Sequence, residues 1–331
     1  MLRAIERVAA PFMVRAQSPT ADLYLTHACG DWIGPKRPIA QLGPGVFASE
    51  ETLLVVRHGG RAGRLPKRRR VFWLIDDHIG PARRDTGLPL GQRMKLALFE
   101  ARHGDRLMAG GAEIVVSSEV LAQAFAGRGT VHRLRPHWAA PLADLAHHDA
   151  GAPLRVAFLG SAVHRADLAF LVPVIEALLA RHPRMELHLA ANHSLGRLSA
   201  HPRVVPIDET GWRAYRARLP RRRFQIALYP LLDTEANRAR SVNKIIEHAI
   251  VGAAGLYSAV WPEAQRVARR GAGLVLANEP EAWIAAATRL IERADERANL
   301  AARGRALAAD LNHPGGQRAF WRHGFGLSSS F

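Results

Sequence analysis

The 331-residue chain has only one cysteine, Cys29, and this scarcity excludes several classes of protein. A single thiol cannot form an internal disulfide, and it cannot supply the sulfur ligands of a zinc ribbon or an iron–sulfur cluster. The sixteen histidines are scattered without an HExxH motif, so the zinc-protease pattern is missing as well. Cys29 lies in THACGDW, where nothing indicates a nucleophile.

Long uninterrupted apolar runs are also lacking. The runs at 168–180 and 245–261 are broken by Glu176 and Glu247, whereas a membrane-spanning helix needs about 20 predominantly apolar residues. Residues 1–19 carry a glutamate inside their apolar stretch and no small-residue cleavage site, so we interpret them as mature protein. We therefore expect a soluble cytoplasmic protein.

Lysine is scarce as well, since only four of the 46 basic residues are lysine. This bias is typical of a GC-rich genome, but the net charge of +17 still attracts phosphates and anionic membranes. Arginines cluster at 61–70 and 215–223 without the interleaved aromatics that stack single-stranded nucleic acid. We interpret the clusters as solvated faces, with phosphate or membrane contact as the alternative, and expect no specific nucleic-acid partner.

Apolar strand-like runs alternate with helical patterns along the chain. Strands are predicted at 22–25, 53–56, 71–75, 113–117, 130–134, 154–160, 185–190, 204–207, 224–230, 255–260 and 273–277. Helices are predicted at about 91–108, 118–126, 168–179, 211–219, 241–251, 280–292 and 295–310. Pro173 predicts a kink or a late start for the third of these helices.

Continuous apolar strands separated by helices indicate parallel sheets buried on both faces. Two such sets, joined near 147–153, predict an α/β protein with two Rossmann-like doubly wound domains that face a cleft. We place the first domain at 1–150 and the second at 151–331. Because ligands of open α/β sheets bind at the carboxyl ends of strands, candidate residues should follow those ends.

The segment 228–258 carries the most informative pattern. A strand is followed by a polar loop and by a helix that we expect to begin at Ser241 as N-cap and to end at Gly252. Asn243, Lys244 and Glu247 fall on one face of its first two turns. A helix N-terminus with a lysine suits a phosphate, and a carboxylate one turn on can accept both hydroxyls of a ribose. The alternative is an exposed face with an ordinary Lys–Glu pair.

The order N-K-x-x-E-x-x-x-x-G-x-x, followed by an apolar strand that ends in serine, resembles the donor site of retaining GT-B glycosyltransferases (group 1, family 4-like). The order of elements over 154–325 is similar too, and that over 20–140 only loosely. The resemblance implies transfer of a sugar from a nucleotide-diphosphate-sugar donor to an acceptor hydroxyl. It also implies that Glu247 holds the donor ribose and that basic residues hold the diphosphate.

Two positions depart from the family pattern, because Ala239 replaces a common acidic residue that contacts the donor sugar and Ala254 replaces a usual proline. Some branches of the family carry a P-L-x-D-T-x-x-N loop instead. The loop after Pro230 resembles it, which makes Asp233 and Asn237 candidate donor-binding residues.

A second candidate segment follows the strand at 154–160. Gly160 and Ser161 form a strand-to-helix turn where backbone can approach a phosphate, although the full G-x-G-x-x-G pattern is missing. His164 and Arg165 come at the start of the next helix, where the family places a basic residue against the diphosphate. His164 is a candidate catalytic residue, with a capping role as the alternative.

In the first domain, Asp76 and Asp77 follow the apolar strand at 71–75. At a strand's carboxyl end they are candidates for accepting a proton from, or orienting, the acceptor hydroxyl. The repulsion between them predicts a raised pKa for one. Alternatives are that Asp77 caps the following turn, or that both bind a metal with His78, although the ligand spacing is missing. Ser117 and Ser118 follow the next strand, and an N-cap is the favoured role.

Together these features predict a glycosyltransferase of cell-surface polysaccharide or glycolipid synthesis that needs neither metal nor cofactor. Lys244, Arg165 and the helix N-terminus would neutralise the leaving diphosphate. The expected acceptor is a carbohydrate or lipid-linked molecule, with the enzyme peripheral on the inner face of an anionic membrane. The alternatives are a catalytically degenerate binding protein, supported by Ala239, and a basic nucleic-acid-binding protein.

Overall fold

A computed structural model describes residues 18–58, 65–88, 90–149, 153–160, 164–190, 195–207 and 211–328. The chain forms two compact units. Unit 1 comprises Met1–Ala139, Ala239–Ser241 and Asn312–Phe331, and unit 2 comprises Ala140–Arg238 and Val242–Leu311. The assignment of domains to 1–150 and 151–331 stays a prediction, while the compact units divide the chain after Ala139 and return two later segments to unit 1.

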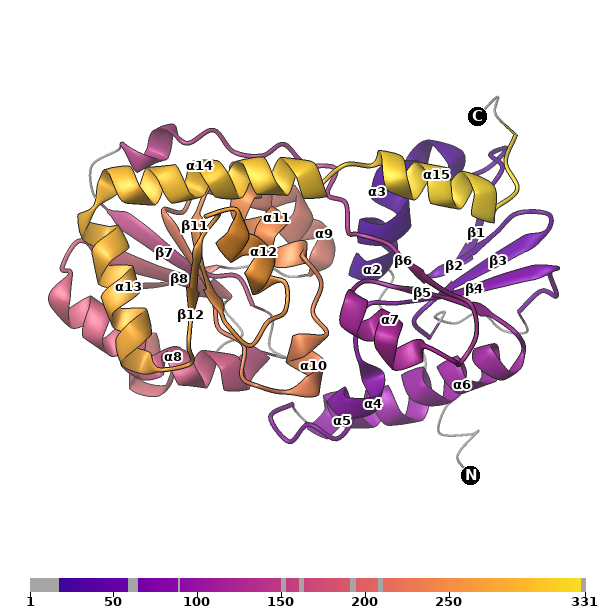
Figure 1. Cartoon of the computed structure of the whole chain (residues 1–331), viewed down its shortest axis with the longest axis horizontal. Coiled ribbons are helices and arrows are strands. Elements are labelled where there is room, and N and C mark those ends of the chain that lie inside the picture. The colour runs from indigo at the N-terminus through magenta and orange to yellow at the C-terminus, as the bar shows by residue number, and fades with distance from the viewer. Residues whose placement is uncertain are drawn as a thin grey trace. The chain divides into compact units, whose positions relative to one another are not determined.

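Unit 1 is built on a six-stranded sheet with strand order β1-β2-β3-β4-β5-β6 (Figure 1). The pairs from β3 to β6 are parallel, and β1 and β2 add an antiparallel edge. The strands are β1 (Ala40–Gly43), β2 (Val46–Ala48), β3 (Thr52–Val56), β4 (Arg70–Ile75), β5 (Glu113–Val116) and β6 (Val131–Arg133). The helices are α2 (Pro19–Ala21), α3 (His27–Cys29), α4 (Ile79–Ala82), α5 (Leu90–Lys95), α6 (Arg102–Ala109), α7 (Glu119–Phe125) and α15 (Gly315–Gly324). Shorter helical turns span Asp22–Thr26, Gly30–Trp32 and Leu96–Ala101.

The strand predicted at 22–25 is wrong, because these residues form a π-helical turn between α2 and α3. Ser18 caps the preceding helix by accepting a hydrogen bond from the Ala21 amide, and Pro19 occupies the first helical position. This is a strong helix-start pair. The helical winding still buries the apolar side chains that suggested a strand.

Unit 2 is built on a fully parallel six-stranded sheet with strand order β12-β11-β10-β7-β8-β9. The strands are β7 (Leu154–Phe158), β8 (Met185–Ala190), β9 (Val204–Ile207), β10 (Ile226–Tyr229), β11 (Ala254–Ser258) and β12 (Leu274–Leu276). The helices are α8 (Arg165–Arg181), α9 (Trp212–Arg218), α10 (Glu235–Arg238), α11 (Asn243–Ile250), α12 (Ala264–Arg269), α13 (Pro280–Glu292) and α14 (Ala294–Leu311). Short 3-10 turns span Ala146–His148, Gly196–Ala200 and Leu219–Arg221.

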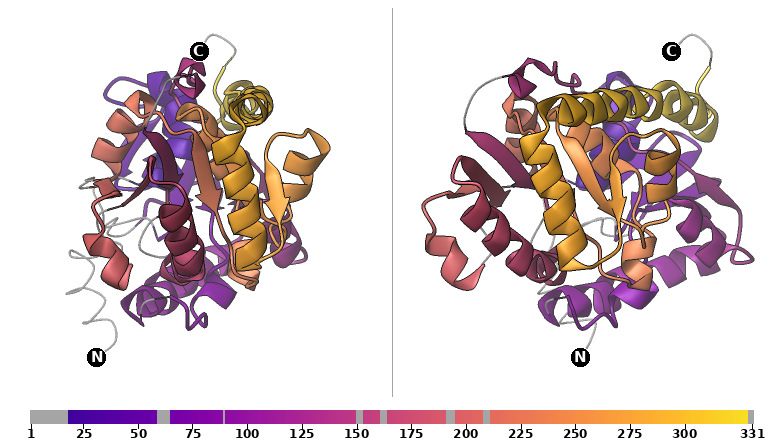
Figure 2. Two further views of the ribbon diagram at one scale, coloured as in Figure 1. Left: turned by 90° about the vertical axis from the view of Figure 1, so that its left-hand side faces the viewer. Right: turned by 60° about the vertical axis from the view of Figure 1, so that its left-hand side comes forward.

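Counted along the unit, the strand order is 3-2-1-4-5-6, the order of a Rossmann fold. Helix α13 packs alongside α8 (Figure 2), and α14 runs beside α11 and β11 (Figure 1). The apolar faces of α8, α13 and α14 share one core with the strands. The prediction of an α/β protein with two units, each built on a parallel-stranded core, is confirmed.

Helix α8 begins at Arg165, so the late start expected from Pro173 is wrong. The proline lies inside the helix, where it removes one backbone hydrogen bond. Leu168, Leu171 and Ile175 are buried in the core, and this burial offsets the loss. Within the part of the chain that the structure describes, no helix has the length and low charge that crossing a bilayer would demand.

Candidate functional site

In unit 2 the strand order reverses between β7 and β10, which are neighbours in the sheet. Connections from these two strands leave the sheet to opposite sides, so the carboxyl ends of β7 and β10 border the crevice where open α/β sheets bind ligands. Gly160 follows β7, and the polar loop with Asp233 follows β10. The candidate donor-binding residues of the sequence therefore cluster at the switch point of the sheet.

Glu247 on α11 is the best-defined group of this site. Its side chain is almost fully buried, yet both oxygens have partners. The Tyr215 hydroxyl of α9 donates to Oε1 at 2.6 Å, and the Lys244 ammonium donates to Oε2. Lys244 also donates to the carbonyl of Leu159 at the end of β7. Three elements are thus joined around one carboxylate. The Lys244–Glu247 ion pair of the alternative interpretation is present, but it is largely buried and does not lie on an exposed face.

Helix α11 begins at Asn243, and its N-cap is Val242, so the N-cap prediction for Ser241 is wrong. Ser241 belongs to the segment that returns to unit 1, where its side chain hydrogen-bonds Tyr24. The predicted end of the helix is confirmed. Gly252 has φ +74°, and the amides of Gly252 and Ala253 bond the carbonyls of the last turn in a Schellman arrangement.

A second network at the switch point is centred on Asp167 in the first turn of α8. Its Oδ1 accepts hydrogen bonds from the Leu232 amide at 2.8 Å and from Asn237 Nδ2 at 3.0 Å. Its Oδ2 lies 2.8 Å from His164 Nδ1. Because an ionised carboxylate only accepts hydrogen bonds, Nδ1 is the protonated nitrogen of His164. Asp167 thereby ties the loop after β10 to the start of α8.

The other candidate residues of unit 2 are placed less centrally. Arg165 is the first residue of α8 and is exposed. Asp233 forms an ion pair of 2.6 Å with Arg238 on the exposed side of its loop. A Cβ on Gly160 would lie 2.5 Å from the Phe158 ring, so close packing of the turn depends on glycine there. Ser161 lies outside the described residues.

In unit 1, Asp76 and Asp77 follow β4 and are held by arginines. Arg57 Nη1 lies 2.9 Å from Asp76 Oδ1 and 2.6 Å from Asp77 Oδ2, and Arg240 Nη1 lies 2.6 Å from Asp77 Oδ1. Thr20 donates to the second oxygen of Asp76 at 2.9 Å. Both carboxylates are therefore present at the strand end, but Asp77 is bound on both oxygens by guanidinium groups.

Arg57 is the hub of this cluster. It follows β3 with φ +55°, a left-handed conformation that non-glycine residues rarely adopt. Its guanidinium also pairs with the fully buried Glu100 at 2.7 Å. Burial opposes the charged form of Arg57, but Glu100, Asp77 and Asp76 outweigh it and hold the pKa well above its usual value. Backbone strain maintained by such a network is typical of functional sites.

The two carboxylates differ in what they can do chemically. Burial raises the pKa of Asp76, and the negative charge of Asp77 adds to the rise although Arg57 opposes it. The raised pKa makes Asp76 a better proton acceptor than an ordinary aspartate. Ser117 donates to the Asp76 carbonyl at 3.2 Å, and Ser118 is the N-cap of α7, as expected.

Several of these residues escape sequence reasoning. Arg57 directly follows an apolar strand, so the rule that singled out Asp76 also applies to it. Glu100 and Tyr215 lie inside helical segments where no local pattern marks them. Asp167 lies two residues after Arg165, and its link to Asn237 becomes visible only once the two turns are folded together.

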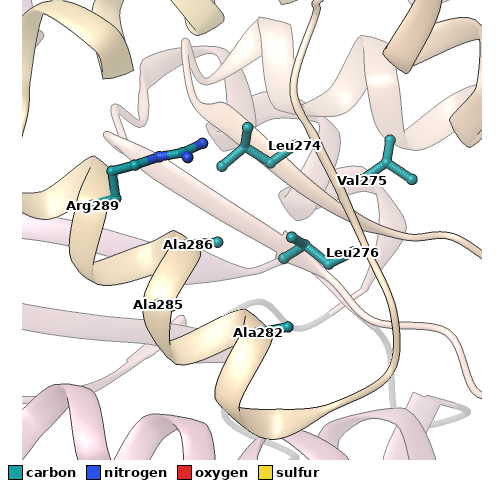
Figure 3. Close-up of a pocket in the computed structure, with 7 residues that line it drawn as sticks. All are labelled: Leu274, Val275, Leu276, Ala282, Ala285, Ala286 and Arg289. Carbon is teal, nitrogen blue, oxygen red and sulfur yellow. The ribbon is translucent and has the colours of Figure 1, made fainter.

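Other site types find little support in the described ranges. No group of three or more His, Cys, Asp or Glu side chains is arranged there to hold a metal ion. A pocket of about 400 Å³ lies between β12 and α13 (Figure 3), and none of the candidate residues lines it. It is lined by Leu274, Val275, Leu276, Ala282, Ala285, Ala286 and Arg289. Its apolar walls carry one cation, and that arginine is already paired with Glu296 at 3.1 Å.

No family model matches the sequence, and no curated protein matches it. Solved structures do match the fold. TarM aligns with 82% of this chain and 54% of its own at 10% identity and a TM-score of 0.56. Sucrose-phosphate synthase of Thermosynechococcus elongatus aligns with 84% of this chain and 74% of its own at 14% identity and a TM-score of 0.55. The chain thus spans about half of TarM.

WaaG, a glycosyltransferase involved in lipopolysaccharide biosynthesis, aligns with 76% of this chain and 77% of its own at 12% identity and a TM-score of 0.51. Like the two proteins above, it is a GT-B glycosyltransferase. The chain therefore has the GT-B fold, as the resemblance at 154–325 implied. At identities of 10 to 14% the likeness establishes the fold alone.

Proposed function

We propose that this protein is a retaining glycosyltransferase that moves a sugar from a nucleotide-diphosphate donor to an acceptor hydroxyl. One observation carries the proposal: Lys244 and Glu247 form a buried pair at the switch point of a Rossmann-ordered sheet. Similar structures of Anabaena HepE and Staphylococcus aureus TarM contain UDP, the former with glucose and the latter with α-GlcNAc-glycerol. A nucleoside diphosphate is accordingly the first ligand to test.

The proposed donor contacts of Glu247 and Lys244 follow from their unused hydrogen-bonding capacity. A carboxylate offers about four acceptor positions, and Tyr215 and Lys244 take one on each oxygen of Glu247. We assign the remaining positions to the two hydroxyls of a ribose. We assign the third hydrogen of Lys244, with Asn243 and the exposed Arg165, to the diphosphate, where they stabilise the leaving group without a metal. Asn237, Asp233, Gly160 and Ser161 complete the proposed donor loops.

Asp76 and His164 are the proposed catalytic candidates, and Asp77 orients Asp76 through their shared arginine. The raised pKa of Asp76 suits a group that takes the proton of the acceptor hydroxyl. Asp76→Asn should abolish transfer and leave nucleotide affinity unchanged, because the proposed donor contacts belong to unit 2. Unchanged transfer by this variant would remove Asp76 from the catalytic role.

Calorimetric titration with UDP and other nucleoside diphosphates tests donor binding. Glu247→Gln should weaken binding by about 1.5–3 kcal/mol, the range for hydrogen bonds to a charged group. Glu263→Gln is the matched control, since Glu263 is also paired with a cation three residues away in the sequence. Equal affinity of both variants and the wild type would remove Glu247 from the site.

A degenerate binding protein is the second candidate, and Ala239 favours it. This residue is buried, and its carbonyl accepts a hydrogen bond from Ser118 at 2.7 Å, so no carboxylate stands there to contact a donor sugar. Nucleotide-sugar hydrolysis, or transfer to a glycan or lipid-linked acceptor, distinguishes the candidates. Nucleotide binding with neither reaction would establish the binding protein.

The proposal includes an anionic membrane, which is where a lipid-linked or cell-surface acceptor is located. The net charge of +17 supports it. The arginine clusters support it less, because Arg70 pairs with Glu113, Arg223 pairs with Asp144, and residues 61–64 lie outside the described part.

A further inference from the structure

Large apolar side chains that are mostly exposed are rare in the described part of the chain. Leu90 is 63% exposed and Met94 is 51% exposed, followed by Leu42 at 49%. Leu90 and Met94 are four residues apart on α5, so they lie on the same side of this helix. Leu42 stands apart from them on the edge strand β1. Leu90 and Met94 therefore form a mostly exposed apolar pair on α5.

The surroundings of the pair are basic. Helix α5 continues through the π-helical turn Leu96–Ala101 into α6, and Arg102 and Arg106 are exposed farther along this run. Arg83 and Arg84 are exposed at the end of α4, which packs against the same run (Figure 1).

The acidic residues of the run do not offset this charge. Glu100 is fully buried against Arg57 and Lys95, and Asp105 pairs with Arg128. Helix α5 thus presents two exposed apolar side chains, and the neighbouring elements of the same run carry exposed arginines.

We propose that α5 is the surface by which this protein docks on an anionic lipid membrane. Leu90 and Met94 enter the acyl boundary, and the flanking arginines keep their guanidinium groups at the phosphate level. A second copy of the chain is a poor occupant, because it would bring the same positive charge to the contact. The inference rests on the membrane partner proposed above and adds the side chains that make the contact.

The test is flotation with vesicles of zwitterionic lipid alone and with a third of anionic phosphatidylglycerol. The wild type should bind the anionic vesicles, and the double variant Leu90→Gln, Met94→Gln should bind them about tenfold more weakly, since two apolar side chains are lost. The double variant keeps every charge, so generic attraction by the net charge is unchanged. Leu42→Gln is the matched control and should bind as the wild type does.

Each outcome decides between the two proposals. Absent binding by the wild type overturns the membrane partner and the docking surface together. Equal binding by the wild type and the double variant overturns the docking surface alone and leaves membrane attraction to the distributed charge. An equal loss in Leu42→Gln also overturns the assignment to α5. Melting curves of all variants verify folding, which these exposed substitutions should not affect.

Discussion

Glu247 and Asp76 are both poorly accessible carboxylates, but their neighbours prepare them for different tasks. Glu247 receives a hydrogen bond from a hydroxyl and an ion pair from an ammonium, so its orientation is fixed before any ligand arrives. Asp76 shares its arginine with a second carboxylate, and burial raises its pKa. A carboxylate with a fixed orientation suits ligand recognition, whereas a carboxylate with a raised pKa suits proton transfer.

The hydroxyl of Tyr215 should matter for nucleotide recognition through Glu247. Tyr215→Phe removes the bond to Oε1 and frees the carboxylate to rotate, so nucleotide affinity should fall about three- to tenfold, as expected for one hydrogen bond of about 1 kcal/mol. A nucleoside diphosphate lacking both ribose hydroxyls should show no such difference, since it does not use the carboxylate. Titration calorimetry with both ligands measures the effect.

Tyr257→Phe is the matched control. Its hydroxyl also pairs with a side chain of α11, the buried His248 at 3.0 Å, but not with Glu247. An equal loss of affinity in both variants would mean that Tyr215 supports the fold of unit 2 rather than the orientation of the carboxylate.

Removal of Arg57 should destabilise unit 1 strongly. Arg57→Ala leaves Asp76, Asp77 and the fully buried Glu100 without their shared cation, and breaking such a buried network costs about 3–5 kcal/mol. Arg69→Ala is the control, since Arg69 is 83% exposed and its pair with Glu51 spans 3.8 Å. It should change stability by less than about 0.5 kcal/mol. Urea unfolding compares the two, and similar midpoints would contradict the role of Arg57 as hub.

At the scale of whole elements, the end of α11 depends on one glycine. Gly252→Ala should destabilise unit 2, because the left-handed backbone disfavours a side chain and the new Cβ would lie 2.6 Å from His147. Gly196 shares the positive φ, but a Cβ there meets nothing within 4 Å. Gly196→Ala should therefore cost only the backbone strain of about 1 kcal/mol. If both variants lowered the melting temperature equally, the end of α11 would have shifted to accommodate the new Cβ. The predicted contact with His147 would then cost no stability.

Elements that bury a continuous apolar run are predictable from the sequence. The strand predicted at 71–75 is β4, the strand at 204–207 is β9, and the helix at 280–292 is α13. Burial on both faces of β4 and on one face of α13 produces a local apolar pattern, whereas β9 is only partly buried and is marked by its β-branched residues. The predicted end of α11 at Gly252 also comes from a local rule.

Elements that depend on distant partners escaped prediction. The hairpin of β1 and β2 was missed because β1 is mostly exposed and carries no apolar alternation. Helix α15 was missed because its anchors lie far away in the sequence: Trp321 donates to the Tyr24 carbonyl at 2.6 Å, and Gln317 donates to that of Leu23 at 2.8 Å.

The contacts of the candidate site likewise divide into local ones, which the sequence indicates, and distant ones, which it does not. Lys244 and Glu247 are three residues apart on a helix, so their contact is visible in the sequence. Tyr215 reaches Glu247 from a separate helix, and Arg240 reaches Asp77 across a sequence distance of 163 residues. Such contacts are set by strand order, which no short window of sequence contains.

Across the whole molecule, buried neutral histidines couple stability to pH in both units. Burial lowers the pKa of His58 in unit 1 to about 4, that of His148 in unit 2 to about 4, and that of His248 in unit 2 to about 3. In the unfolded chain these histidines titrate near pH 6.5. Between these values the unfolded state binds more protons than the folded state, so stability should fall as pH drops from about 6.5 towards 4.

His248 offers the clearest test of this coupling, because its side chain is 1% exposed. Each such histidine contributes a slope of about 1.4 kcal/mol per pH unit in this window. His248→Gln cannot take up a proton, so unit 2 of this variant should lose less stability than the wild type between pH 6.5 and 4.5. Urea unfolding of both proteins across this range measures the two slopes. Parallel slopes for His248→Gln and the wild type would mean that His248 is not held neutral by burial.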